Sequence, residues 1–193
     1  AGAAGGALLI GGAGAAIAAE VGTEDVDVNV NIAALPPVGA LTMSVAADAT
    51  TLSEVPSGDA DIRQFNGTLP TVTVTDDREE VPESVFWYVN GQSSAFTGPN
   101  GATLPAGHLG WAPALLNTDG NGEVAEGPEV GTVLDDDEGL VGEELLALAL
   151  DSGEAATVGT WQANAGLFLK TPVTVAPGAY SGTITLTLWE DAY

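Results

Sequence analysis

The sequence predicts an all-β fold, an antiparallel Greek-key or immunoglobulin-like β-sandwich that follows an apolar N-terminal extension. Short runs of β-branched and aromatic residues, in which apolar and polar side chains alternate, recur from residue 26 to residue 189. Turn-forming pairs such as Asn90-Gly91 and Pro177-Gly178 separate these runs. Residues 1–19, in contrast, carry no charge and are almost wholly Ala, Gly, Leu and Ile. These observations predict an apolar segment, residues 1–20, and one sandwich domain, residues 21–193.

The apolar segment 1–20 has two interpretations. In the first, it is an assembly segment that neighbouring copies of the protein bury, with a helix as one form of packing. In the second, residues 1–19 are the remnant of a signal peptide, because Ala16-Ile17-Ala18 fits a small-x-small cleavage site. We prefer the first. Its large apolar side chains are Leu8, Leu9, Ile10 and Ile17.

The first predicted strand is VDVNVNI, residues 26–32, in which apolar and polar residues alternate strictly. Its apolar face consists of Val26, Val28, Val30 and Ile32. Further predicted strands cover residues 40–46, 69–75, 85–91, 159–170 and 180–189. Residues 139–156 (GLVGEELLALALDSGEAA) are ambiguous, because EELLALAL fits both a short helix and an alternating strand.

The large aromatic residues are predicted to fill the core of the sandwich. Each tryptophan lies in or beside a predicted strand and has apolar neighbours at strand spacing. The tryptophans are Trp87, Trp111, Trp161 and Trp189. Stacking of exposed tryptophans on carbohydrate is the alternative. Tyr180 follows the turn Pro177-Gly178, where a hydrogen bond from its hydroxyl to the backbone would fix a corner, as in other sandwiches.

The charge of the chain excludes whole classes of partner. The 3 Lys and Arg residues stand against 27 Asp and Glu, which gives a net charge of -24. Nucleic-acid binding needs cationic side chains that displace counterions, so we exclude it. The hydrophobic fraction of 45% indicates a folded acidic domain, not a disordered acidic tail. There is no cysteine, which excludes disulfides, thiolate zinc sites and thiol nucleophiles.

Metal binding is the site chemistry that the sequence supports best. Loop carboxylates suit a hard ion such as Ca²⁺, although a solvated acidic turn is the simpler interpretation. The densest such run is Asp135, Asp136, Asp137 and Glu138. His108, the one histidine, is predicted to be structural, since no G-x-S-x-G elbow accompanies it. We therefore expect no catalytic residue and no cofactor other than calcium. Asn66-Gly67-Thr68 is a glycosylation acceptor triplet.

Four blocks of sequence occur in one order: LPTVTVTDDR (69–78), FWYVNGQSSAF (86–96), LPAGHLGWAP (104–113) and VAPGAYSGTITLTL (175–188). Through them the chain resembles, over roughly residues 40–190, the cell-surface β-sandwich proteins of Actinobacteria described as WxL-like. That resemblance implies an exported, surface-associated, non-enzymatic module. The family's Trp-x-Leu signature is replaced here by Leu109-Gly110-Trp111 and Leu188-Trp189.

The layout of residues 1–20 also resembles that of type IV pilin-like precursors, which keep an apolar segment after processing. The early Glu of the mature pilin helix is lacking, since the first acidic residue here is Glu20. This resemblance implies a protein that forms filaments.

The predicted function is that of an extracellular structural protein, a subunit of a pilus-like filament at the cell surface that assembles through its N-terminal segment. Either residues 1–20 pack as a helix in the filament core, or residues 26–32 add a strand to a neighbour's open sheet edge. The predicted partners are further copies of the chain, with the cell wall or glycans as others. The alternative is a monomeric secreted or cell-wall-associated binding module whose residues 1–19 are signal-peptide remnant.

Overall fold

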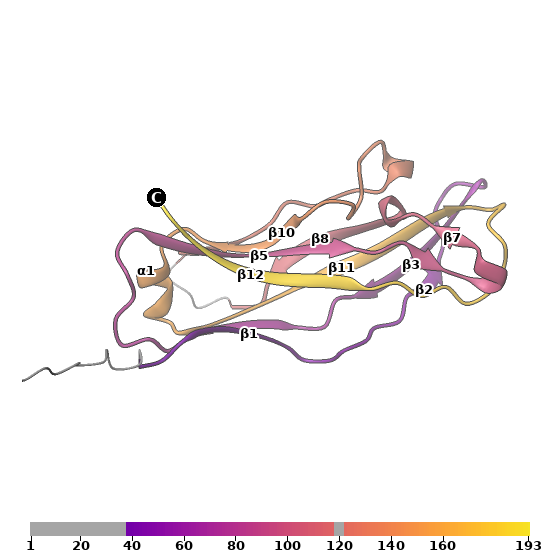
Figure 1. Cartoon of the computed structure of the whole chain (residues 1–193). Helices are drawn as coiled ribbons and strands as arrows, with labels where there is room; N and C mark the ends of the chain where they lie inside the picture. The colour runs from indigo at the N-terminus through magenta and orange to yellow at the C-terminus, as the bar shows by residue number, and fades with distance from the viewer. Residues whose placement is uncertain (1–37, 118–121) are drawn as a thin grey trace, which may run out of the picture. The chain divides into compact units, whose positions relative to one another are not determined.

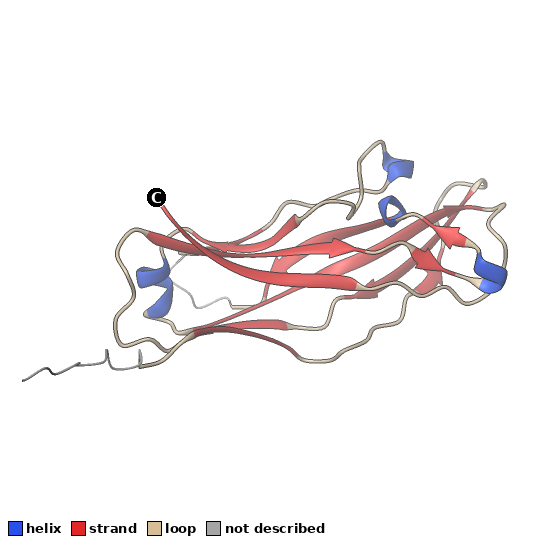
Figure 2. Ribbon diagram, in the orientation of Figure 1, coloured by secondary structure: helices blue, strands red, loops and turns tan. Residues whose placement is uncertain are grey.

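The computed structural model describes residues 38–117 and 122–193, which all belong to one compact unit, Pro36–Tyr193. Antiparallel strands dominate these residues (Figures 1 and 2). The predicted all-β antiparallel sandwich is confirmed. The predicted segment 1–20 and the predicted strand 26–32 lie outside the described residues.

The first sheet is built around one long strand, β11. The first part of β11 pairs with β4 and the second part with β3, while its other edge pairs with β8. The short strands β1 and β2 then pair with β4 and β3, so they form the outer edge of this sheet. The bounds are β1 (Leu41–Val45), β2 (Ser53–Val55), β3 (Ile62–Thr68), β4 (Val72–Asp76), β8 (Leu109–Leu115) and β11 (Thr160–Pro172).

The second sheet has the order β12-β5-β10-β9, with β12 at one edge. Its strands are β5 (Val85–Ser93), β9 (Val124–Glu126), β10 (Glu144–Ala149) and β12 (Ile184–Ala192). The remaining elements are β6 (Phe96–Thr97), β7 (Thr103–Leu104), the α-helix α1 (Ser152–Ala156) and the 3₁₀ turns η1 (Pro99–Gly101), η2 (Ala106–His108) and η3 (Val133–Asp135). Within the part of the chain that the structure describes, no helix is long and apolar enough to cross a membrane.

Each predicted strand within the described residues overlaps an observed one, with shifted ends. The ambiguous segment 139–156 contains both elements: β10, and then α1. The change comes at Asp151, whose side chain accepts a hydrogen bond from the backbone N–H of Glu154 (3.0 Å) and so caps the helix. Leu146, Ala147 and Ala149 are buried in β10, which explains its run of apolar residues.

Three tryptophans are buried in the core between the sheets, as predicted: Trp87, Trp111 and Trp161. The prediction for Trp189 was wrong, because this side chain is 43% exposed. Leu186 and Leu188 of β12 pack against the core, so the period of two places Trp189 on the outer face, opposite Tyr88. Trp111 also explains Gly91 of the facing sheet, since a Cβ at Gly91 would lie 2.6 Å from the Trp111 ring.

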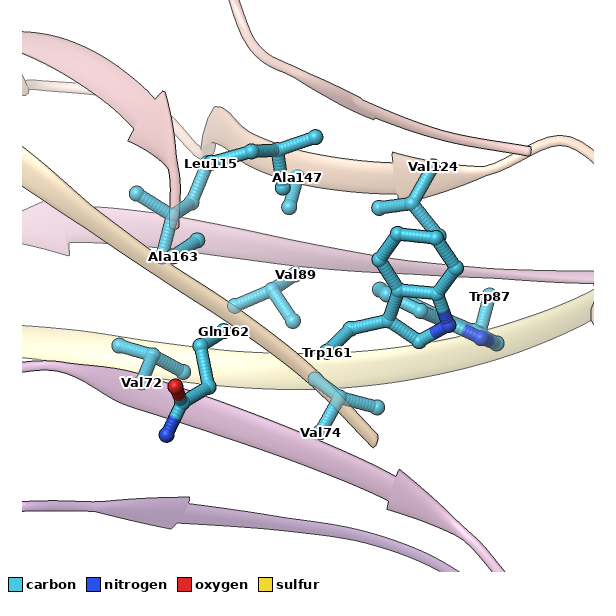
Figure 3. A pocket seen from close by; sticks show the side chains of 11 residues that line it. Val72, Val74, Trp87, Val89, Leu115, Val124, Ala147, Trp161, Gln162 and Ala163 are labelled. Carbon is cyan, nitrogen blue, oxygen red and sulfur yellow. The ribbon is translucent and has the colours of Figure 1, made fainter. Parts of the chain in front are cut away.

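The core is closed at the end of the sandwich where α1 lies (Figure 1). The indole N–H of Trp161 donates a hydrogen bond to the carbonyl of Ala155 in α1 (2.9 Å). The gap that remains between the two sheets there has a volume of about 10 Å³, and Figure 3 shows the side chains that line it, among them Trp87 and Val89. Such a gap holds at most about one water molecule, so it is part of the core packing and no ligand site.

An ion-pair network joins the two sheets at this closed end. Arg78 donates two hydrogen bonds to Asp76 at the end of β4 (2.6 and 2.8 Å) and two to Glu190 of β12 (2.8 and 3.0 Å). The side chains are 13% exposed for Arg78, 3% for Asp76 and 27% for Glu190. The hydrogen bonds from Arg78 to Asp76 and then to Glu190 raise the pKa of the Arg78 guanidinium. The guanidinium therefore neutralises a nearly buried carboxylate and bridges the sheets.

Candidate functional site: an apolar groove between two sheet edges

The core is open where β1 ends and β12 begins. A groove with a volume of about 880 Å³ lies there, and both strands line it, β1 through Met43 and Val45 and β12 through Ile184 and Leu186. Its size falls in the range of about 300–1,000 Å³ that is usual for binding sites in proteins. The groove is far larger than the gap of about 10 Å³ at the closed end of the core.

The lining of the groove is an unfinished part of the core. Its floor consists of buried leucines: Leu69, Leu104, Leu109, Leu167 and Leu169. Eight of the eleven half-buried apolar residues that pack against the core also line it: Met43, Leu52, Phe65, Phe96, Val175, Tyr180, Ile184 and Leu186. A sandwich normally covers such side chains with a further strand. A segment that filled the groove would therefore complete the core.

One wall of the groove is the connection between β1 and β2, residues 46–52. Leu52 holds this connection against β3, because its side chain fills the space where a Cβ of Gly67 would lie (2.5 Å). The hydroxyl of Thr50 donates to the carbonyl of Thr68 (2.9 Å). Residues 46–51 are all exposed, so the wall has little cover of its own.

The opposite wall is the connection between β11 and β12, and a tyrosine fixes it. The hydroxyl of Tyr180 donates to the carbonyl of Ala176 (3.0 Å), which confirms the predicted backbone hydrogen bond. The Tyr180 ring lies where a Cβ of Gly98 would be (2.3 Å), so it packs directly on the backbone near β6. Thr97 and Ser181 exchange two backbone hydrogen bonds (2.8 and 3.0 Å). These contacts attach the wall to the backbone around β6.

Both strands that flank the groove are edge strands. Among the described residues, β12 pairs only with β5, and β1 pairs only with β4. Each edge thus leaves a row of backbone N–H and C=O groups that another strand can pair with. The groove combines an apolar lining with these hydrogen-bonding edges, which together suit an extended peptide segment.

The groove is nearly uncharged, in a protein with a net charge of -24. Its lining includes one carboxylate, Asp48, and one guanidinium, Arg63. Arg63 is engaged by Glu54, with its Nε 2.8 Å from a carboxylate oxygen. The hydrogen bond from Arg63 lowers the pKa of the exposed Glu54 carboxyl. Because the lining carries one charge of each sign, an uncharged apolar segment suits it better than an ionic ligand.

The predicted calcium residues lie in the loop around η3, and hydrogen bonds within the loop use two of their side chains. Asp135 accepts from the backbone and hydroxyl of Thr132 (3.0 and 2.8 Å) and from Lys170 Nζ (2.5 Å). Asp137 accepts from the backbone of Gly131 (2.9 Å) and of Glu138 (2.8 Å). Over residues 38–117 and 122–193, no group of three or more potential ligands could hold a metal ion. Calcium binding by Asp135, Asp136, Asp137 and Glu138 stays a prediction.

The loop makes stability depend on pH through Asp135. Burial would raise the pKa of this carboxyl, but hydrogen bonds from Lys170 and Thr132 outweigh burial and hold the pKa below its usual value. A lowered folded-state pKa stabilises the protein above the unfolded value of about 3.9, and this contribution is lost as pH falls through the folded pKa. Asp135→Asn is therefore expected to lower the melting temperature by about 2–4 °C at pH 7, and by less below about pH 4.

Melting curves from about pH 7 to about pH 2 test this expectation, with Asp136→Asn as the control that removes the same charge from the same loop. A difference between Asp135→Asn and the native chain that persists unchanged at the lowest pH would contradict it.

The other predicted site residues lie apart from the groove or outside the described residues. His108 donates its Nδ1–H to the carbonyl of Lys170 (2.7 Å), because a carbonyl can only accept, and its structural role stays a prediction. The side chain of Asn66 is exposed on β3, and its glycosylation stays a prediction. The predicted assembly residues Leu8, Leu9, Ile10, Ile17, Val26, Val28, Val30 and Ile32 lie outside the described residues.

No family model and no curated protein matches the sequence. Among solved structures, the chain is similar to a family 123 glycoside hydrolase from Clostridium perfringens, with 17% identity and a TM-score of 0.32, over 65% of this chain and 18% of that chain. It is also similar to the CupB6 tip adhesin from Pseudomonas aeruginosa, with 12% identity and a TM-score of 0.36, over 81% of this chain and 46% of that chain. The chain spans less than half the length of either protein, and similarities this weak carry no argument about function.

Proposed function

We propose that the protein is an extracellular structural subunit that assembles with further copies of itself into a pilus-like surface filament. The observation that carries the proposal is the apolar groove of about 880 Å³ between two strands whose outer edges no described strand covers. Exposed apolar surface and unpaired sheet edges both favour association with another chain. The WxL-like resemblance and the pilin-like layout of residues 1–20 support a location at the cell surface and a role in adhesion.

Charge sets the conditions for assembly. Copies with a net charge of -24 repel one another in dilute salt. The distance over which salt screens charges falls from about 30 Å at 0.01 M to about 3 Å at 1 M. Since the groove itself is nearly neutral, screening removes the repulsion and leaves the apolar contact intact. We therefore expect salt to promote assembly.

The proposed subunit is not an enzyme. His108 is bound to a backbone carbonyl, and Asp135 to Lys170 and Thr132, so these two groups already have structural partners. The proposal needs no catalytic residue and no cofactor. Its chemistry is that of backbone hydrogen bonds and apolar burial.

A pair of neighbouring substitutions on β12 tests the proposal. Leu186 lines the groove, whereas Thr185 is exposed and lies opposite Gln92 on the outer face. Leu186→Asp is expected to shift the protein from large polymers to monomers in sedimentation velocity at about 1 M salt. Thr185→Asp adds the same charge one residue away, and is expected to leave the polymers intact. Sedimentation of the native chain as a monomer would contradict the proposal.

The outer face of the second sheet favours the alternative of a glycan-binding module. Phe86 stacks with Tyr88 at 5.9 Å and contacts Tyr193 at 5.1 Å between ring centroids. Trp189 lies beside Tyr88 and is 43% exposed. Of these rings Trp189 and Tyr193 are exposed, and exposed aromatic rings can stack on sugars. The sedimentation experiment separates the two functions, because the alternative requires a monomer.

A further inference from the structure

We infer that residues 26–32 of a second copy fill the groove as an added strand along the free edge of β12. This inference rests on the proposed function and names the partner that the groove receives. Of the two modes of assembly that the sequence allows, a helical filament core and strand addition, we infer strand addition.

The sequence of residues 26–32 matches both features of the groove. Its apolar positions recur every second residue, so on a strand they all point to one side, toward the leucine floor. Asp27, Asn29 and Asn31 point to the other side, where water is available. The segment thus supplies apolar side chains for the lining and backbone groups for the edge. Residues 1–20 have no such alternation, and their Gly content disfavours a strand.

The edge of β12 suits this strand better than the edge formed by β1 and β2. β12 is continuous over residues 184–192, whereas the opposite edge is broken between Val45, where β1 ends, and Ser53, where β2 begins. A seven-residue strand is about 23 Å long and needs an unbroken partner to form its full ladder. The free edge of β12 offers one.

The position at which the chain enters the described fold favours a second copy over the chain's own segment. The entry lies at the closed end, where the backbone of Ala40 donates to the side chain of Asp77 (2.6 Å) and accepts from the Asp77 backbone (3.3 Å). From there β1 runs toward the groove and first lines it at Met43. The first described residues therefore lie at the end of the sandwich opposite the groove.

To fill its own groove, the chain would have to reverse direction within residues 33–37. That stretch contains Pro36-Pro37. Proline, and the residue before it, favour extended conformations. The inference therefore takes the segment that fills the groove from a neighbouring copy. This arrangement links each copy to the next, and so generates a chain of subunits.

Disulfide formation tests the inference, because the natural chain has no cysteine. One preparation carries Leu186→Cys in the groove and a mass tag. A second, untagged set carries single cysteines at Val26, Val28, Val30 or Ile32, and the controls carry them at Asp27, Asn29 or Asn31. The two are refolded together from denaturant and oxidised, and mixed dimers are counted on a non-reducing gel. Bond formation needs the two Cα atoms about 4.4–6.8 Å apart.

We expect mixed dimers with at least one apolar position, and yields about fivefold lower at the polar positions on either side of it. Ile184→Cys, also in the lining, repeats the experiment in case Leu186→Cys fails to fold.

A chain that carries both cysteines tests insertion into its own groove, which would give a cross-linked monomer and no mixed dimer. Equal yields at neighbouring positions, or that monomer, would overturn the inference. If the native chain forms polymers but no mixed dimer appears, the inference is overturned and the proposed function stands. If the native chain stays monomeric, the proposed function itself is contradicted.

Discussion

Replacement of both Val28 and Val30 by Asp is expected to convert the polymer into monomers. Each substitution places a carboxylate against the apolar lining of the neighbour's groove. Burial of an unpaired charge costs several kcal/mol, and every 1.4 kcal/mol lowers affinity about tenfold. Two such changes are expected to lower the affinity between subunits at least a thousandfold. Sedimentation velocity at about 1 M salt measures the loss directly.

The matched control is the double variant Asn29→Asp/Asn31→Asp. It adds the same two charges to the same segment, but on the side that faces water in the inferred strand. It is expected to assemble like the native chain, with at most a small additional salt dependence. Equal loss of polymers in both variants would show that added charge, and not burial of the valine side chains, controls assembly.

Arg78→Met is expected to lower the stability of the sandwich more than any change to the exposed ion pairs. It would leave Asp76, 3% exposed, without the guanidinium that neutralises it, and would remove the bridge to Glu190. Removal of one partner from a buried ion pair costs about 3–5 kcal/mol, and because Glu190 is partly exposed we expect about 2–4 kcal/mol here. The melting temperature should fall by roughly 5–12 °C.

Arg63→Met is the matched control for this prediction. Arg63 also forms an ion pair, with Glu54, but the two side chains are 38% and 51% exposed. An exposed pair of this kind contributes little, so the melting temperature should change by no more than about 2 °C. Both variants are best compared in the Val28→Asp/Val30→Asp background, since assembly would otherwise add to apparent stability. Equal shifts for Arg78→Met and Arg63→Met would contradict the role given to the network at the closed end.

Alternation of apolar and polar residues is the signal that made the fold predictable. It located β1, β4, β5, β11 and β12, whereas residues 139–156, which contain β10, stayed ambiguous between a helix and a strand. It also contained the information on Trp189, because Leu186 and Leu188 already define the inner face of β12. The prediction for Trp189 failed because its apolar neighbour Leu188 is adjacent in sequence and therefore faces the other side of the strand. Tyr180 was predicted correctly, since its bond to Ala176 depends on a local turn.

The strands β2 and β3 could not be predicted from the sequence, because their residues, SEV in β2 and IRQFNGT in β3, lack alternation. Tertiary pairing with β11 determines β3, and β2 then pairs with β3. The groove was missed for a related reason: its lining comes from segments far apart in sequence, and only the sheet order brings them together. The one signal available was residues 26–32, the most regular alternation in the chain.

Electron cryo-microscopy of the native polymer tests whether a strand from a neighbouring copy completes the sandwich. We predict density for one added strand along β12, with valine side chains toward Leu167 and Leu169 and with a backbone that continues into the adjacent subunit. An empty groove in a well-resolved polymer, or a strand that traces back to the same subunit, would contradict strand addition between copies.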